Sequence, residues 1–177
     1  MNLNDAGNLV LFNHQNSVVW QSFYHPTAAL LPGQKLFTGH QLKSSVSSTN
    51  SSEGIYTLQV TDKGLFIYVE SNPPQPYYNR FVYPYDNDTK ERKNYIRFLN
   101  GSLSLFIHSS EPSGLDIAIN IPPASSTRYM KLMLDGHLQV WQSDSFEWTM
   151  VSDVTMLDEF EEECDFPLVC QRYIIDV

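Results

Sequence analysis

Short apolar runs separated by turn residues dominate the hydrophobic pattern of this chain. The runs are rich in β-branched and aromatic residues, and they lie at 8–12, 18–20, 55–60, 65–69, 95–99, 103–108, 129–134 and 138–141. No window keeps the 3.6-residue period of an amphipathic helix, and ten prolines disfavour helices further. The pattern therefore predicts an all-β fold.

Two dipeptides mark the turns between apolar runs most clearly. Asn100-Gly101 and Asp135-Gly136 each separate two predicted strands. Dipeptides of this type favour a type I′ turn, in which both central residues have positive φ. We therefore predict a β-hairpin at each of them, with type I′ geometry.

Breaks in composition divide the chain into four segments. A Ser/Thr-rich stretch at 41–53 predicts a linker between a first unit at 1–40 and a second unit at 54–152, with a tail at 153–177. Three or four strands in 40 residues cannot close a core alone. The first unit must therefore either pack on the second unit or lack an N-terminal part.

Composition and charge narrow the class of protein. The length of 177 residues fits about one domain or two small ones, and 42% hydrophobic residues are enough to form a core. The net charge of −9 argues against nucleic acid as a partner. Seven acidic residues without a base at 153–165 predict a solvated segment. The sequence shows neither a signal peptide at its start nor an apolar run long enough for a transmembrane helix.

One long string carries a family resemblance. Trp20–Thr27 reads WQSFYHPT, Leu30–Gln34 reads LLPGQ, and Gly7–Leu11 before them reads GNLVL. This string resembles the bulb-type lectin domain of plant G-type lectin S-receptor-like kinases and of the related secreted S-locus-type glycoproteins. Further matches follow in the family's order, at Gly54–Leu58, Tyr129–Leu138 and Cys164–Cys170.

The resemblance implies a β-prism II fold, made of three small antiparallel sheets around a pseudo-threefold axis. Residues 1–40 would be the C-terminal part of a bulb-type lectin domain, which makes an incomplete first prism. Residues 54–152 would form a second lectin-like prism, and 153–177 an acidic segment with a truncated EGF-like start. Trp20 would be a core anchor, and His25, inside the matching string, would have a structural role.

Bulb-type lectins bind mannose through the pattern Q-x-D-x-N-x-V-x-Y on one strand, and two stretches align with it. The first offers Asn4, Asn8, Val10 and Phe12, but Ala6 replaces the Asp acceptor and Phe12 lacks the Tyr hydroxyl. The second keeps only Asp135. Each missing hydrogen bond weakens sugar binding, so ordinary strand roles are favoured for these residues.

Other candidate chemistry is sparse. Sequons at Asn50, Asn87 and Asn100 are candidate glycosylation sites, and Cys164 and Cys170 are candidate disulfide partners. Five scattered histidines show no metal-ligand spacing, and no serine or cysteine stands in a nucleophile motif. We therefore predict no catalytic residue, no metal site and no cofactor.

The resulting prediction is a non-catalytic extracellular recognition module, a fragment of a receptor-like kinase ectodomain that perceives a ligand. Kinase motifs do not occur in this chain. The resemblance implies a mannose-type glycan or a protein or peptide as ligand, dimerisation of the receptor, and a place outside the cell. The second unit's sheets and the aromatic stretch from Tyr77-Tyr78 to Tyr83–Tyr85 would form the contact surface. A true mannose lectin and a non-functional truncated remnant are the alternatives.

Overall fold

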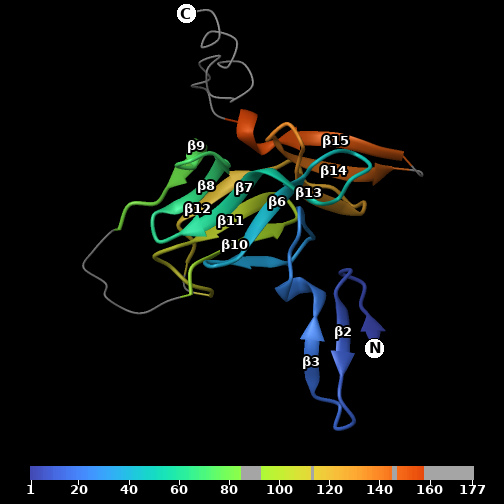
Figure 1. Cartoon of the computed structure of the whole chain (residues 1–177). Helices are drawn as coiled ribbons and strands as arrows, with labels where there is room; N and C mark the ends of the chain where they lie inside the picture. Colours follow the sequence, from blue (N-terminus) through green and yellow to red (C-terminus); the bar gives the residue numbers. More distant parts are fainter. Residues whose placement is uncertain (85–92, 113, 145–146, 158–177) are drawn as a thin grey trace, which may run out of the picture.

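The described residues form an all-β molecule, as predicted. The computed structural model describes residues 1–84, 93–112, 114–144 and 147–157. Within these ranges it has three four-stranded sheets, one three-stranded sheet and no α-helix. All strand pairs are antiparallel. The three larger sheets surround one core and form the β-prism (Figure 1).

Each four-stranded sheet combines three consecutive strands with one strand from the segment 29–45. In order across the sheet, the first contains β6 (Gln41–Ser45), β7 (Glu53–Thr61), β8 (Gly64–Val69) and β9 (Gln75–Phe81). The second contains β12 (Ile117–Asn120), β11 (Ser102–Phe106), β10 (Tyr95–Leu99) and β5 (Lys35–Phe37). The third contains β15 (Glu147–Asp153), β14 (Leu138–Asp144), β13 (Arg128–Leu132) and β4 (Ala29–Leu30), and the short 3-10 helix η2 (Val154–Met156) follows β15.

The segment 29–45 is part of this prism and not of a separate unit. β4, β5 and β6 each place one leucine in the common core, and Leu30, Leu36 and Leu42 are fully buried. The predicted linker at 41–53 is therefore wrong for its first five residues, because β6 pairs with β7 there. The prediction took the serines as a sign of a solvated linker. Ser44 is instead buried, and its hydroxyl accepts a hydrogen bond from the backbone N–H of Tyr56.

The rest of the core comes from alternating positions of the three sheets. These residues are apolar and almost without solvent contact, as the pleat of a half-buried strand requires. The largest of them are Tyr56, Leu58, Leu65, Ile67, Ile96, Phe98, Leu103, Leu105 and Met130. One sheet of a prism cannot cover these side chains alone, so the three sheets stabilise one another.

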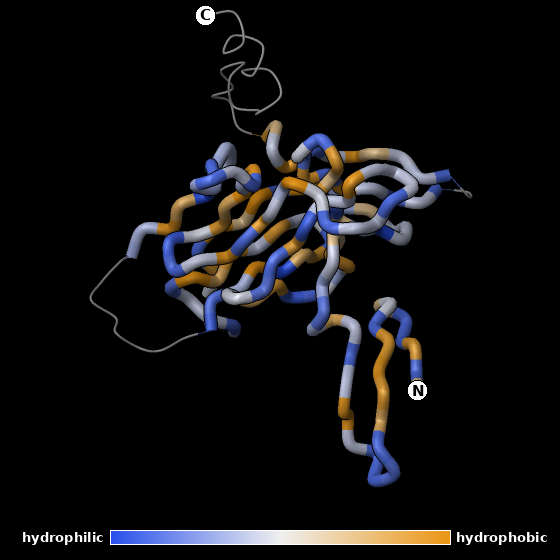
Figure 2. Tube along the Cα trace, in the orientation of Figure 1, coloured by the Kyte–Doolittle hydropathy of each residue, from blue (hydrophilic) through white to orange (hydrophobic). Residues whose placement is uncertain are grey.

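A small three-stranded sheet projects from the prism (Figure 1). It contains β1 (Asn2–Leu3), β2 (Leu9–Phe12) and β3 (Val18–Gln21), and the 3-10 helix η1 (Ser22–Tyr24) connects it to the prism. The apolar residues of β2 and β3 lie along this projection (Figure 2), and Val18 and Val19 are more than half exposed. Trp20 is only partly buried and stacks on His25, with 5.2 Å between the ring centres. The expectation that Trp20 anchors a core is therefore wrong for this chain, since its main ring contact is one exposed imidazole.

Both predicted hairpins form, but their turns are not of type I′. Gly101 and Gly136 have positive φ, at 99° and 91°, whereas Asn100 and Asp135 do not. At the second hairpin the N–H of Gly136 donates to the carbonyl of Met133, and the N–H of Met133 donates to the carbonyl of His137. This is a type I turn closed by a glycine bulge, which needs positive φ at one residue only.

An ion-pair group fastens the outer face of the second sheet. Glu111 receives hydrogen bonds from Lys35, Arg97 and the hydroxyl of Tyr95. The hydrogen bond from Lys35 is the main cause that lowers the pKa of Glu111 to about 2, against the opposing effect of burial. Glu111 is therefore ionised at neutral pH, and it ties β5, β10 and the loop before β12 together.

Several predictions fall on residues outside the described ranges. They concern the sequon at Asn87, the ring of Tyr85, Cys164 and Cys170, and all of the acidic segment beyond residue 157. Asp153, counted in that acidic segment, instead ends β15 and caps η2 with its side chain. In the part of the chain that the structure describes, no helix is long and apolar enough to cross a membrane.

Candidate functional site

The first mannose-type strand has its central residue turned inward. Asn8 is 7% exposed, and its Nδ2 donates to Oε1 of Gln21 at 2.7 Å. Its Oδ1 accepts from the hydroxyl of Ser22 at 3.2 Å and from the N–H of Phe23 at 3.1 Å. The amide of Asn8 thus fixes the end of β3 and the start of η1. A sugar hydroxyl could donate to the carbonyl oxygen of this amide only by displacing one of these bonds.

The other predicted residues of this strand offer little more to a sugar. Oδ1 of Asn4 accepts from the N–H groups of Ala6 and Asn8, at 3.1 and 2.9 Å, and so shapes the turn before β2. Val10 is half-buried within the sheet, and Phe12 presents a partly exposed ring without a hydroxyl. The structure thus brings the four residues onto one turn and strand without forming a set of free hydrogen-bonding groups.

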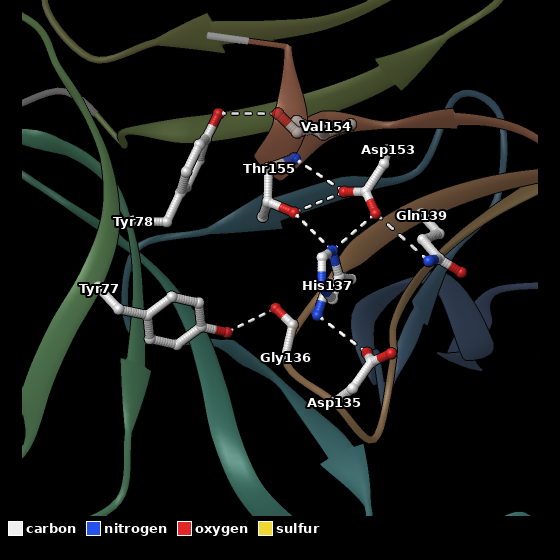
Figure 3. Close-up of polar contacts among 9 residues, drawn as sticks. All are labelled: Tyr77, Tyr78, Asp135, Gly136, His137, Gln139, Asp153, Val154 and Thr155. Carbon is white, nitrogen blue, oxygen red and sulfur yellow. Dashed lines mark hydrogen bonds and ion pairs between the residues drawn. The ribbon is translucent and has the colours of Figure 1, made fainter. Parts of the chain in front are cut away.

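The second mannose-type strand also uses its polar groups internally (Figure 3). Oδ1 of Asp135 accepts from the backbone N–H of His137 at 3.2 Å and shapes the turn before β14. The ring Nδ1 of His137 lies 2.7 Å from Oδ2 of Asp153. Oδ1 of Asp153 in turn accepts from the N–H of Thr155 at 3.1 Å and caps η2.

The two places repeat one structural device. In each, the residue after the glycine of the turn contacts the last residue of the second strand that follows, and one member of the pair caps a 3-10 helix, Asn8 for η1 and Asp153 for η2. Asn8 and Gln21 form the neutral version, and His137 and Asp153 form the ionisable version. Sequence reasoning missed His137 and Asp153, because only Asp135 matched the lectin pattern. The available signal was the common position of Asn8 and His137 directly after a turn glycine.

The tyrosines predicted to form a contact surface differ in their exposure to solvent. The hydroxyl of Tyr78, which is buried, donates to the carbonyl of Val154, and the hydroxyl of the half-buried Tyr77 donates to the carbonyl of Gly136 (Figure 3). These two rings hold β9 against the third sheet and do not form a binding surface. Tyr83 alone among the described tyrosines of the stretch is widely exposed.

A polar recess lies where β6 meets β4 and β13. It has a volume of about 690 Å³, which is within the usual range for small-ligand sites. Its lining contains two lysines, one carboxylate, several hydroxyls and the amide of Gln41, next to the small apolar residues of 26–29. None of the predicted sugar residues lines this recess.

The two described sequons differ in how their amides are used. Asn50 is exposed on the turn between β6 and β7, and its Oδ1 accepts from the N–H of Ser52. Asn100 pairs with the backbone of Ala124 through both amide groups, since Nδ2 donates at 2.8 Å and Oδ1 accepts at 3.0 Å. These two bonds use the amide edge where the oxygen and one N–H lie side by side.

We expect an N-linked glycan on Asn50 and none on Asn100 in folded protein secreted from a eukaryotic host. In a trans amide, the substituent on the nitrogen lies on the same side as the carbonyl oxygen. A glycan on Nδ2 of Asn100 would therefore replace the hydrogen that Asn100 donates to the carbonyl of Ala124. Enzymatic deglycosylation in heavy-oxygen water, followed by peptide mass spectrometry, measures both occupancies. Asn50→Gln is the control that should abolish the signal, and a glycan found on Asn100 would contradict the expectation.

Comparison with known proteins points to a lectin family, in agreement with the β-prism fold. Residues 1–50 match the family described as "D-mannose binding lectin". Two G-type lectin S-receptor-like serine/threonine-protein kinases of Arabidopsis thaliana are 28% and 31% identical to the chain, over 97% and 96% of its length. The chain is a relative of the plant G-type lectin S-receptor-like kinases. The resemblance found in the sequence is therefore confirmed, with the bulb-type lectin match on residues that include β1 to β6.

The chain spans only part of the length of these relatives. It covers 19% of the length of each of the two kinases, and 9% of a third G-type lectin kinase, to which it is 36% identical over 77 residues. No kinase domain is evident in the chain, in agreement with the motifs missing from its sequence.

Proposed function

We propose that this chain is a non-catalytic recognition module of an extracellular receptor ectodomain, and that it perceives a carbohydrate through a surface other than its two mannose-type strands. The family match and the kinase relatives support a carbohydrate-binding ectodomain module. The observation that carries the finer proposal is the internal use of Asn8 and of the His137–Asp153 pair. Groups that already hold 3-10 helices in place are poor ligands for a sugar.

The mannose-lectin alternative has one observation in its favour, the family description itself. Against it, Ala6 and Phe12 supply no hydrogen bond, and the side-chain carbonyl oxygen of Asn8 already accepts two hydrogen bonds from the chain. A sugar that used this oxygen would have to replace an internal bond at its full energetic cost.

A thermal melt of the full chain, with and without 100 mM methyl α-D-mannoside, tests this proposal together with a panel of neutral and acidic oligosaccharides. We expect one cooperative transition that mannoside does not move and that at least one oligosaccharide raises, because a ligand of the folded state alone stabilises it. A rise with mannoside would support the mannose lectin. No rise with any saccharide would overturn carbohydrate recognition and favour a protein or peptide ligand. A melt without cooperativity would support the truncated remnant.

A further inference from the structure

The recess between β6, β4 and β13 is walled by firmly connected backbone. The carbonyl of Thr27 accepts from the N–H of Lys43 at 3.0 Å, and the carbonyl of Ala28 accepts from the N–H of Leu132 at 2.9 Å. Lys131 on β13 pairs with Ala29 on β4. The backbone that lines the recess is thus held in place before any ligand arrives, which lowers the entropy cost of binding.

Its polar groups match neighbouring hydroxyls of a sugar ring. Nζ of Lys43 and Oε2 of Glu53 are 2.9 Å apart, so a donor and an acceptor stand side by side at the rim. Two adjacent hydroxyls, one donating and one accepting, can bridge such a pair. Gln41 adds an Nε2 donor, because its Oε1 already accepts from Gln59. Pro26, Ala28 and Ala29 supply an apolar floor for the C–H face of the ring.

Lys131 gives this recess a positive charge, and a neutral sugar has no negative group to pair with it. It is half-buried, and no carboxylate of the described residues forms an ion pair with it. Lys43 and Glu53 neutralise each other, which leaves the lining with a net positive charge on a chain whose total is −9. Glu70 also acts on Lys43, but it accepts from the hydroxyl of Thr57 and does not line the recess.

We propose that this recess binds an acidic saccharide, with ring hydroxyls on the Lys43–Glu53 pair and a carboxylate, as in a uronic acid, on Lys131. The proposal rests on the carbohydrate recognition proposed above and names its ligand class and site. Charge-assisted hydrogen bonds are the strong ones, so the carboxylate accounts for most of the discrimination against neutral sugars. The mannose-type strands have no part in it.

The test is calorimetric titration of the full chain with α-1,4-linked digalacturonate and with its neutral counterpart, α-1,4-linked galactobiose. We expect digalacturonate to bind about tenfold or more tightly than galactobiose. Lys131→Met should remove that difference, while Glu53→Gln should weaken both sugars. Lys63→Met and Glu147→Gln change exposed residues away from the recess, and both should leave the affinities unchanged. Thermal melts show whether each variant is folded.

The outcomes separate this inference from the proposed function. Equal affinity for the two sugars, or digalacturonate binding that Lys131→Met leaves intact, would overturn the acidic-saccharide site and leave carbohydrate recognition standing. Displacement of digalacturonate by an equal concentration of acetate would reduce the recess to a simple anion site and also overturn the inference. Failure of both sugars, with another saccharide raising the melt, would overturn this site alone. Failure of every saccharide would overturn both proposals.

Discussion

Gly136→Ala is expected to destabilise the prism by about 3 kcal/mol. The backbone of Gly136 has φ of +91°, where a side chain is strained. A Cβ at this position would also lie 2.7 Å from the hydroxyl of Tyr77 and 3.0 Å from the ring of Tyr56. Tyr56 is only 1% exposed and cannot move aside, so steric overlap adds to backbone strain.

Urea denaturation of the full chain measures this loss, and Gly39→Ala is the matched control. Gly39 has nearly the same φ, +90°, but a Cβ there would meet nothing within 4 Å. The control should therefore show only the backbone cost, about 1–2 kcal/mol. A loss for Gly136→Ala no greater than that of Gly39→Ala would show that Tyr56 and Tyr77 do not confine the turn.

Asp153→Ala is expected to cost about 2–3 kcal/mol of unfolding free energy. The side chain is 9% exposed, and it accepts from Thr155 and Gln139 while it faces the ring of His137 (Figure 3). Its removal takes one hydrogen-bond acceptor from Thr155 and Gln139 in a half-buried place and uncaps η2. The exposed Asp62 has no such role, so Asp62→Ala should stay within about 0.5 kcal/mol of the parent chain.

The similarity between the Asn8–Gln21 pair and the His137–Asp153 pair allows a sharper test of the latter. The double substitution His137→Asn with Asp153→Gln recreates the neutral pair of Asn8 and Gln21. We expect it to cost at least about 1 kcal/mol less than the sum of the two single substitutions, as for residues in direct contact. Additive losses, measured by the same urea denaturation, would contradict the structural equivalence of the two places.

Much of the strand content could be read from the sequence, and the reason is local. Strands such as Tyr95–Leu99 and Leu138–Trp141 alternate or run apolar between turn dipeptides, and the pleat converts that pattern directly into a buried face. Asn100-Gly101 and Asp135-Gly136 located two hairpins correctly. The turn type was not predictable from the dipeptide alone, because a glycine bulge and a type I′ turn accept the same residues.

Of the strands that the sequence pattern missed, β4 and β5 have partners that lie far away in the chain, whereas β9, β12 and β15 pair with the strand just before them. β4 and β5 are two and three residues long and gain their stability from β13 and β10, more than 55 positions later. Such short strands leave no periodic pattern. The spacing of Leu30, Leu36 and Leu42 was visible, but only the prism shows that each leucine serves a different sheet.

The sequence by itself determined the all-β class, the relationship to bulb-type lectins and the incomplete mannose pattern, because each depends on residue types at short spacing. Tertiary structure decided what those residues do. It turned the amide of Asn8 and the carboxylate of Asp153 inward, since each is needed to cap a 3-10 helix. It also gathered Lys43, Glu53 and Lys131 at one recess, because β6 and β13 meet only when the three sheets close.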